Sequence, residues 1–128
     1  MSRNLAAALC ALVLVAGCGT KEPVGPVAGE LVVTLTSPGA ADGAVLLRLV
    51  GPVDQVTAEG GYLVESAALS DGITRIVVVG TITSGPVARI SIPDMSQASQ
   101  YFGLVEEVAD RGSFALLSSA GYSVSIAP

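Results

Sequence analysis

The segment "ITRIVVVGTI", residues 73–82, decides the fold class of this chain. Eight of its ten residues are β-branched isoleucine, valine or threonine, which is typical of strands rather than helices. The turn signal Ser70-Asp71-Gly72 stands directly before it. We therefore expect a strand over 73–82 and, because it is so strongly β-branched, a central place in a sheet.

Three other segments alternate apolar and polar residues, as a strand with one buried face does. They cover residues 30–36, 44–51 and 85–94. The residues expected to face the core are Leu31, Val33 and Leu35, then Val45, Leu47 and Leu49, then Ala88, Ile90 and Ile92. Arg48, Arg89 and Ser91 are expected on the opposite faces.

Shorter signals indicate the remaining elements. Residues 53–58 and 61–66 are expected to form a hairpin, joined by the turn Glu59-Gly60-Gly61. Residues 93–101 are expected to form a loop with one helical turn capped by Asp94. Two short strands, in 114–119 and 121–128, close the chain.

Residues 101–113 fit two patterns. Phe102, Leu104 and Val108 recur with period two, with Glu106 as an exception, whereas Leu104 and Val108 also fit a helix at i, i+4. We favour a strand, because aromatic and valine residues dominate the segment, and leave strand or helix open for 101–110. Phe102 and Phe114 are expected in the core, and the tyrosines are expected to bury their rings with the hydroxyls at the rim.

These elements add up to an all-β fold. Eight or nine short strands, with turn signals about every 8–12 residues and almost no helix, are typical of a β-sandwich. The 99 residues from 30 to 128 suit one domain. We therefore expect a single β-sandwich domain over 30–128.

The chain begins with the features of a secretory signal. Arg3 precedes an apolar run that starts at Leu5 and ends near Gly17. A retained transmembrane span would need about 20 apolar residues, and this run is shorter. We therefore expect residues 1–17 to be a signal peptide that is removed.

The tetrapeptide Val15-Ala16-Gly17-Cys18 resembles the lipobox of bacterial lipoproteins. The resemblance implies cleavage between Gly17 and Cys18, a diacylglyceryl group on the Cys18 thiol and, often, acylation of the new amino end, for example with palmitate. Residues 18–29, rich in glycine and proline, would then be a flexible tether. Gly19 stands where an aspartate often retains such lipoproteins at the inner membrane, so the resemblance favours the outer membrane of the bacterial cell envelope, if the cell has one.

The order of the expected strands, with "GPVARISIPD" (85–94) and a late "YFGLVEEVADRGS" (101–113), resembles the cohesin-type, nine-stranded jelly-roll sandwich. That resemblance implies protein–protein assembly through a sheet face or edge, and related folds include carbohydrate-binding modules. An immunoglobulin-like sandwich is the alternative. It usually has a buried tryptophan and often a disulfide, but this chain has no tryptophan and would keep only Cys18 after cleavage.

The composition argues against enzymes. The chain has no histidine, which removes the usual general base and histidine-ligated zinc, and its one lysine, Lys21, lies in the tether. Acidic residues are expected mainly in turns, so no catalytic and no metal-ligating residue is predicted. Calcium is a weak alternative, because Asp42, Asp71 and Asp94 are expected in loops and oxygen ligands suit this ion, yet no DxDxDG motif occurs.

The net charge is −5 and falls to about −6 once Arg3 is removed, which argues against nucleic acid as a partner. We expect a non-enzymatic, lipid-anchored module that binds a protein partner or scaffolds an assembly at the cell envelope, without a cofactor beyond the lipid on Cys18. The alternatives are a small carbohydrate-binding module, favoured by exposed Tyr62 or Tyr101 on a flat face, and a purely structural envelope lipoprotein.

Overall fold

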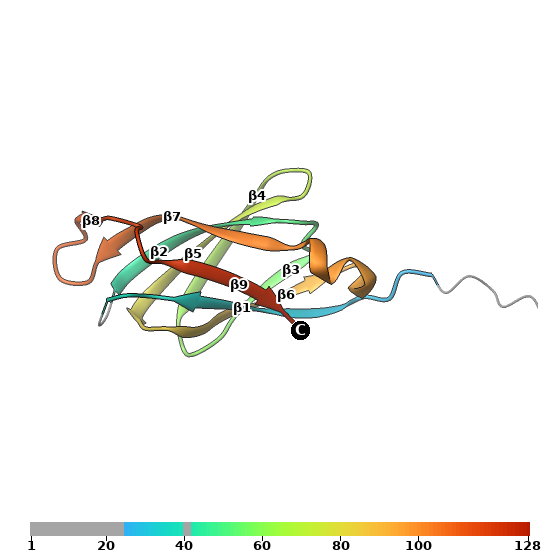
Figure 1. Ribbon diagram of the computed structural model, residues 1–128, viewed down its shortest axis with the longest axis horizontal. Coiled ribbons are helices and arrows are strands. Elements are labelled where there is room, and N and C mark those ends of the chain that lie inside the picture. Colours follow the sequence, from blue (N-terminus) through green and yellow to red (C-terminus); the bar gives the residue numbers. More distant parts are fainter. Residues whose placement is uncertain (1–24, 40–41) are drawn as a thin grey trace, which may run out of the picture.

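The computed structural model describes residues 25–39 and 42–128 and contains two antiparallel sheets packed face to face (Figure 1). The four-stranded sheet has the order β3-β6-β1-β9, and the five-stranded sheet has the order β4-β5-β2-β7-β8. The strands are β1 (Gly29–Thr36), β2 (Asp42–Val50), β3 (Gln55–Ala58), β4 (Leu63–Ser70), β5 (Ile73–Ile82), β6 (Gly85–Ile92), β7 (Phe102–Asp110), β8 (Leu116–Leu117) and β9 (Ser123–Ala127). The predicted all-β sandwich is therefore confirmed.

The core lies between the two sheets, where the predicted inward faces meet. All nine residues predicted inward from 30–36, 44–51 and 85–94 are at most 1% exposed. Strand β5 lies between β4 and β2, as its composition predicts, and it adds Ile76 and Val78 to the core. Burial of these aliphatic side chains is the main stabilising contribution to the fold.

The predicted hairpin between 53–58 and 61–66 is wrong. Gly60 and Gly61 do form a turn, with φ of 68° and 78°. However, β3 pairs with β6 in one sheet and β4 pairs with β5 in the other. Val56 and Val64 each pack against the core, so the turn carries the chain from one layer to the other.

Residues 102–110 form strand β7, as favoured, but the strand contains a β-bulge. Leu46 is paired with Glu107 and Leu47 with Val105, so Glu106 is an extra residue in the ladder. The bulge reverses the alternation, and Val108 therefore faces the core while Leu104 faces outward.

The two phenylalanines were predicted in the core, and that prediction is wrong. Phe102 is 52% exposed and Phe114 is 66% exposed. Phe102 lies before the bulge, on the same side of β7 as Leu104, and Phe114 lies in the loop after β7.

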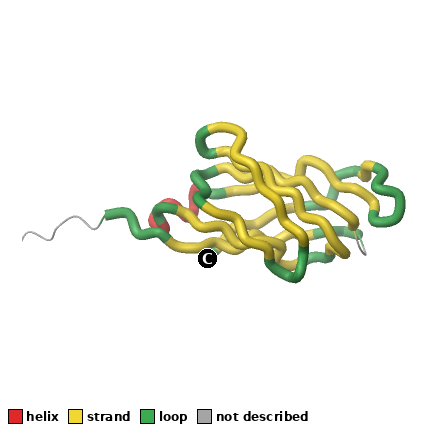
Figure 2. Tube along the Cα trace, turned by 180° about the vertical axis from the view of Figure 1, so that it is seen from behind, coloured by secondary structure: helices red, strands yellow, loops and turns green. Residues whose placement is uncertain are grey.

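The short helix η1 (Met95–Gln100) is the helical turn predicted for 93–101 (Figure 2). The Asp94 carboxylate caps it by accepting a hydrogen bond of 3.0 Å from the Ser96 amide. Tyr101 follows it, with its ring buried and its hydroxyl donating to the Pro52 carbonyl. Burial, and the nearby charges of two aspartates, raise the pKa of Tyr101.

The described chain enters the sandwich at the end where η1 lies, and the β7–β8 hairpin lies at the opposite end (Figure 1). The predicted signal peptide, Cys18 and the first part of the tether lie outside the described residues. Within residues 25–39 and 42–128, no helix is both long and apolar enough to cross a membrane.

Candidate functional site

The two outer faces of the sandwich differ in character. The outer face of the four-stranded sheet is mainly polar and carries serine, threonine and charged side chains. At its centre the Arg89 guanidinium lies 3.6 Å from a Glu30 carboxylate oxygen and donates a hydrogen bond to Glu59. These carboxylates raise the pKa of Arg89. The charged groups at the centre of this face are paired with one another, its serines and threonines are partly or fully exposed to water, and it exposes little apolar surface.

The outer face of the five-stranded sheet is apolar, and we refer to it as the apolar face. Its large exposed side chains are Leu63, Leu69, Val77, Phe102, Leu104 and Leu116, whose exposed fractions range from 37% to 71%. Half-buried Leu46, Val50, Ile73 and Val79 fill the space between them. Clusters of exposed apolar side chains on one face mark interaction sites on soluble domains.

Three charged side chains stand in the middle of the apolar face. Arg48 and Arg75 are directly opposite each other on β2 and β5, an arrangement that is unfavourable for like charges. The Glu106 carboxylate lies 3.3 Å from Arg48 Nε and 2.8 Å from Arg75 Nε. The bulge in β7 brings Glu106 to this position.

This ion triad is only partly satisfied. Arg75 Nε donates a hydrogen bond to Glu106, but Arg48 Nε is buried and makes no hydrogen bond, since its contact with Glu106 lacks hydrogen-bond geometry. Two arginines share one carboxylate, so the triad carries a surplus positive charge in an otherwise acidic protein.

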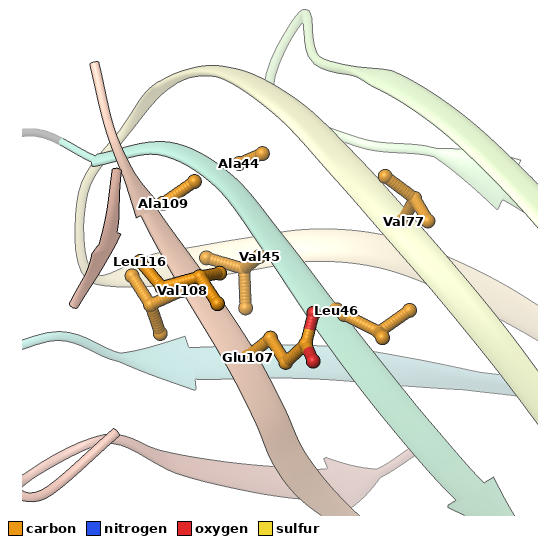
Figure 3. Close-up of a pocket in the computed structure, with 8 residues that line it drawn as sticks. All are labelled: Ala44, Val45, Leu46, Val77, Glu107, Val108, Ala109 and Leu116. Carbon is orange, nitrogen blue, oxygen red and sulfur yellow. The ribbon is translucent and has the colours of Figure 1, made fainter. Parts of the chain in front are cut away.

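A depression of about 210 Å³ opens at the β8 end of the apolar face (Figure 3). Ala44 and Ala109 are paired across β2 and β7, and their single methyl groups leave its floor low. Leu46, Leu116 and Glu107 stand around it. A second depression, of about 350 Å³, shares Leu46 and Val77 with the first and reaches β4.

The loop between β7 and β8 holds Phe114 outward. The Asp110 carboxylate accepts hydrogen bonds from the amides of Gly112 and Ser113 and from the Ser113 hydroxyl, at 2.9–3.0 Å, and these bonds lower the pKa of Asp110. Phe114 has φ of 55°, in the left-handed region that side chains other than glycine seldom adopt. The loop that carries the exposed Phe114 lies at the end opposite the N-terminal entry (Figure 1).

The three aspartates considered for calcium do not come together as a ligand set. Asp42 was expected in a loop, but it lies in β2 and is 2% exposed. Its carboxylate accepts hydrogen bonds of 2.9 Å from Tyr122 Oη and from Ser37 Oγ. Asp94 caps η1, and Asp71 lies in the turn between β4 and β5. Among the described residues, no three histidine, cysteine, aspartate or glutamate side chains are grouped as metal ligands would be.

The tyrosines do not form a flat platform for a sugar. Tyr101 is buried, and Tyr62 is half-buried, with its ring beside Gly60 and Gly80 and its hydroxyl accepting from the Thr83 amide at 3.4 Å.

Comparisons with protein-family models, with curated proteins and with solved structures find no match for this chain. The candidate site therefore depends on the geometry of the face alone. The sequence pattern did not predict that Phe102 and Leu104 are exposed. The Glu106-Glu107 doublet, which breaks the alternation of β7, was the one signal of a bulge that could have revealed them.

Proposed function

We propose that this protein is a non-enzymatic, lipid-anchored recognition module that binds another protein through its apolar face. The observation that supports the proposal is the contrast between the two outer faces, one polar and one rich in exposed leucine, valine and phenylalanine. A domain that only needed to remain soluble would gain nothing from exposing these side chains on one side.

The anchor in this proposal is Cys18, through the resemblance of residues 15–18 to a lipobox. Gly29, where β1 begins, lies eleven residues after Cys18, and a fully extended chain of that length spans at most about 40 Å. A tether of this reach lets the domain stand off a bacterial envelope membrane, the outer membrane where there are two. The flank that carries the apolar face would then be accessible to a partner.

The chemistry of the face favours a folded protein as the partner. Leucine, valine and phenylalanine side chains on a sheet supply the apolar contact area on which protein interfaces depend. A nucleic acid would need a basic patch, and a sugar would favour a platform of several exposed aromatic rings, whereas the large exposed side chains of the apolar face include one aromatic, Phe102. The partner is therefore expected to present an apolar patch of its own.

Two glutamate substitutions on opposite faces test the proposal. Leu104→Glu places a charge on the apolar face, and Ser125→Glu places the same charge on the exposed, polar face of β9. Detergent-solubilised, full-length protein is used to capture partners from an envelope extract, and it is also applied to a glycan array. We expect the original chain and Ser125→Glu to capture the same protein and Leu104→Glu to lose it at least tenfold, a loss of about 1.4 kcal/mol or more.

Three results would overturn the proposal. Equal capture by both variants would exclude the apolar face. Glycan binding without protein capture would favour the carbohydrate-binding alternative, and no binding in either experiment would favour a structural envelope protein. The anchor is tested separately, because Cys18→Ala should move the protein from the membrane fraction to the soluble fraction.

A further inference from the structure

Strand β4 is an unprotected edge of the five-stranded sheet. It pairs with β5 alone, and with eight residues it is the longest of the four edge strands that the described residues form. Native proteins usually protect sheet edges with prolines, several charges or very short strands. Strand β8 has only two residues and β9 is followed directly by Pro128, whereas β4 contains no proline and a single charge, Glu65.

The side chains of β4 alternate between two sides. Leu63, Glu65 and Ala67 are paired with outward-facing residues of β5 and so lie on the apolar face, where Leu69 also lines the second depression. Val64, Ser66 and Ala68 are on the other side. The ladder with β5 is regular up to Ala68 and irregular beyond it, so a new strand is best added along Val64–Ala68, whose middle residue is Ser66.

Self-pairing of this edge has one favourable register. In an antiparallel pair, the side chains of opposed residues point to the same face, so a two-fold axis must pass midway between the two copies of one residue of β4. An axis at Glu65 would oppose two carboxylates, which is destabilising. An axis at Ala67 would oppose Glu65 to the apolar Leu69. An axis at Ser66 instead brings Leu63 of each copy beside Leu69 of the other, at the two ends of the paired stretch, and these are two of the exposed leucines.

Charge complementarity favours the same register. With the axis at Ser66, Glu65 of one copy lies opposite Ala67 of the other, whose neighbour on β5 is Arg75. Arg75 shares Glu106 with Arg48, so on association its long side chain can turn from Glu106 and extend across the Ala67 methyl group to Glu65 of the second copy, over two strand spacings of about 4.8 Å each, which leaves Glu106 to Arg48. Glu65 has no ion-pair partner within the described part of the chain, and the pair Arg48 and Arg75 has a surplus positive charge. The second copy would therefore give Glu65 a positive partner and the arginine pair a second carboxylate.

We propose that two copies of this chain associate by antiparallel pairing of their β4 strands about a two-fold axis at Ser66. The pairing joins two five-stranded sheets into one continuous sheet and places their apolar faces side by side. The strand that pairs with this edge is therefore β4 of a second copy, and this association is independent of the protein partner proposed above.

Single-cysteine substitutions along β4, in the full chain in membranes of a bacterial host, test the register. Opposed Cα atoms in an antiparallel pair are about 4.5–5.5 Å apart, within the range a disulfide can bridge. Ser66→Cys should therefore form a disulfide-linked dimer under mild oxidation. The diagonal positions at 65 and 67 would be about 7–8 Å from their own copies and should cross-link poorly. Val64→Cys and Ala68→Cys should each fail alone but cross-link when the two variants are co-expressed.

The chain without an added cysteine gives the background, and Ser125→Cys, on the exposed face of β9, measures random collision. We expect the dimer fraction of Ser66→Cys to exceed that of Ser125→Cys about tenfold, because only the former meets disulfide geometry. Adding Glu65→Arg to Ser66→Cys should lower the dimer fraction to that of Ser125→Cys, because the new arginine would lie near Arg75 of the second copy. Equal cross-linking at all positions, none at Ser66, or a maximum at Glu65 or Ala67 would overturn the proposal, whatever the outcome of partner capture.

Discussion

The separation of buried and exposed leucines in the five-stranded sheet can be tested with two identical truncations. Leu47 on β2 is fully buried, and Leu104 on neighbouring β7 is 51% exposed. Leu47 is paired with Val105, the residue next to Leu104, so the two leucines lie close together on opposite sides of one sheet. Leu47→Ala and Leu104→Ala remove the same atoms from these two environments.

The expected costs differ by a factor of about three. Leu47→Ala loses the transfer free energy of its buried carbons and leaves a cavity, which costs about 3 kcal/mol. Leu104→Ala loses about half of a transfer term of ~2.4 kcal/mol and leaves no cavity, so it costs about 1 kcal/mol. For a domain of this size, 1 kcal/mol corresponds to a change in Tm of about 4–8 °C. Leu47→Ala should therefore lower Tm by about 12–24 °C, and Leu104→Ala by no more than about 8 °C.

Thermal unfolding followed by far-ultraviolet circular dichroism measures both changes, since the chain has no tryptophan to report by fluorescence. Each variant is compared with the original protein in the same detergent. Equal losses in Tm would contradict the exposed position of Leu104, because they would mean that this side chain is covered in the folded protein. A loss below about 4 °C for Leu47→Ala would refute the assignment of β2 to the core.

Three further predictions concern single contacts. Gly51→Ala should destabilise the protein by about 1–3 kcal/mol, because Gly51 has φ of 126° and an added Cβ would clash with the Tyr101 ring; urea unfolding measures the change. Tyr122→Phe should cost about 1–3 kcal/mol in the same assay, because buried Asp42 loses the hydrogen bond that the Tyr122 hydroxyl donates, and an unchanged midpoint would contradict this. The carboxyl of Asp110 should titrate by NMR below its ordinary value of 3.8, so that its contribution to stability is present above that pH and is lost as the pH falls through the lowered pKa; a midpoint at or above 3.8 would contradict the loop geometry.

Much of the fold could be predicted from the sequence because one-sided burial leaves a period of two. In residues 30–36, 44–51 and 85–94, every residue predicted to face the core is buried; Val87, an extra residue where the register of β1 and β6 shifts, is also buried and was not predicted. The helical turn after Asp94 was also predictable, because an aspartate cap acts on amides two or three residues away. These signals are local.

The features that were missed depend on partners distant in the chain. A Gly-Gly turn has the same local chemistry whether it closes a hairpin or crosses between sheets, so residues 59–61 could not indicate that β3 pairs with β6. The bulge at Glu106 is defined by its register against β2, and it changes which face Phe102 occupies. The period-two pattern that identified the core therefore could not predict the exposed side chains that β7 adds to the apolar face.

Photo-cross-linking in intact cells tests the proposed role of the apolar face most directly. A photoreactive amino acid is placed at Leu104, and the same amino acid is placed at Ser125 on the polar face as the control. If partners bind the apolar face, we expect a covalent adduct with another protein from position 104 and none from position 125. An adduct from position 125 alone, equal adducts from both positions, or none from position 104 would contradict the proposed role of this face.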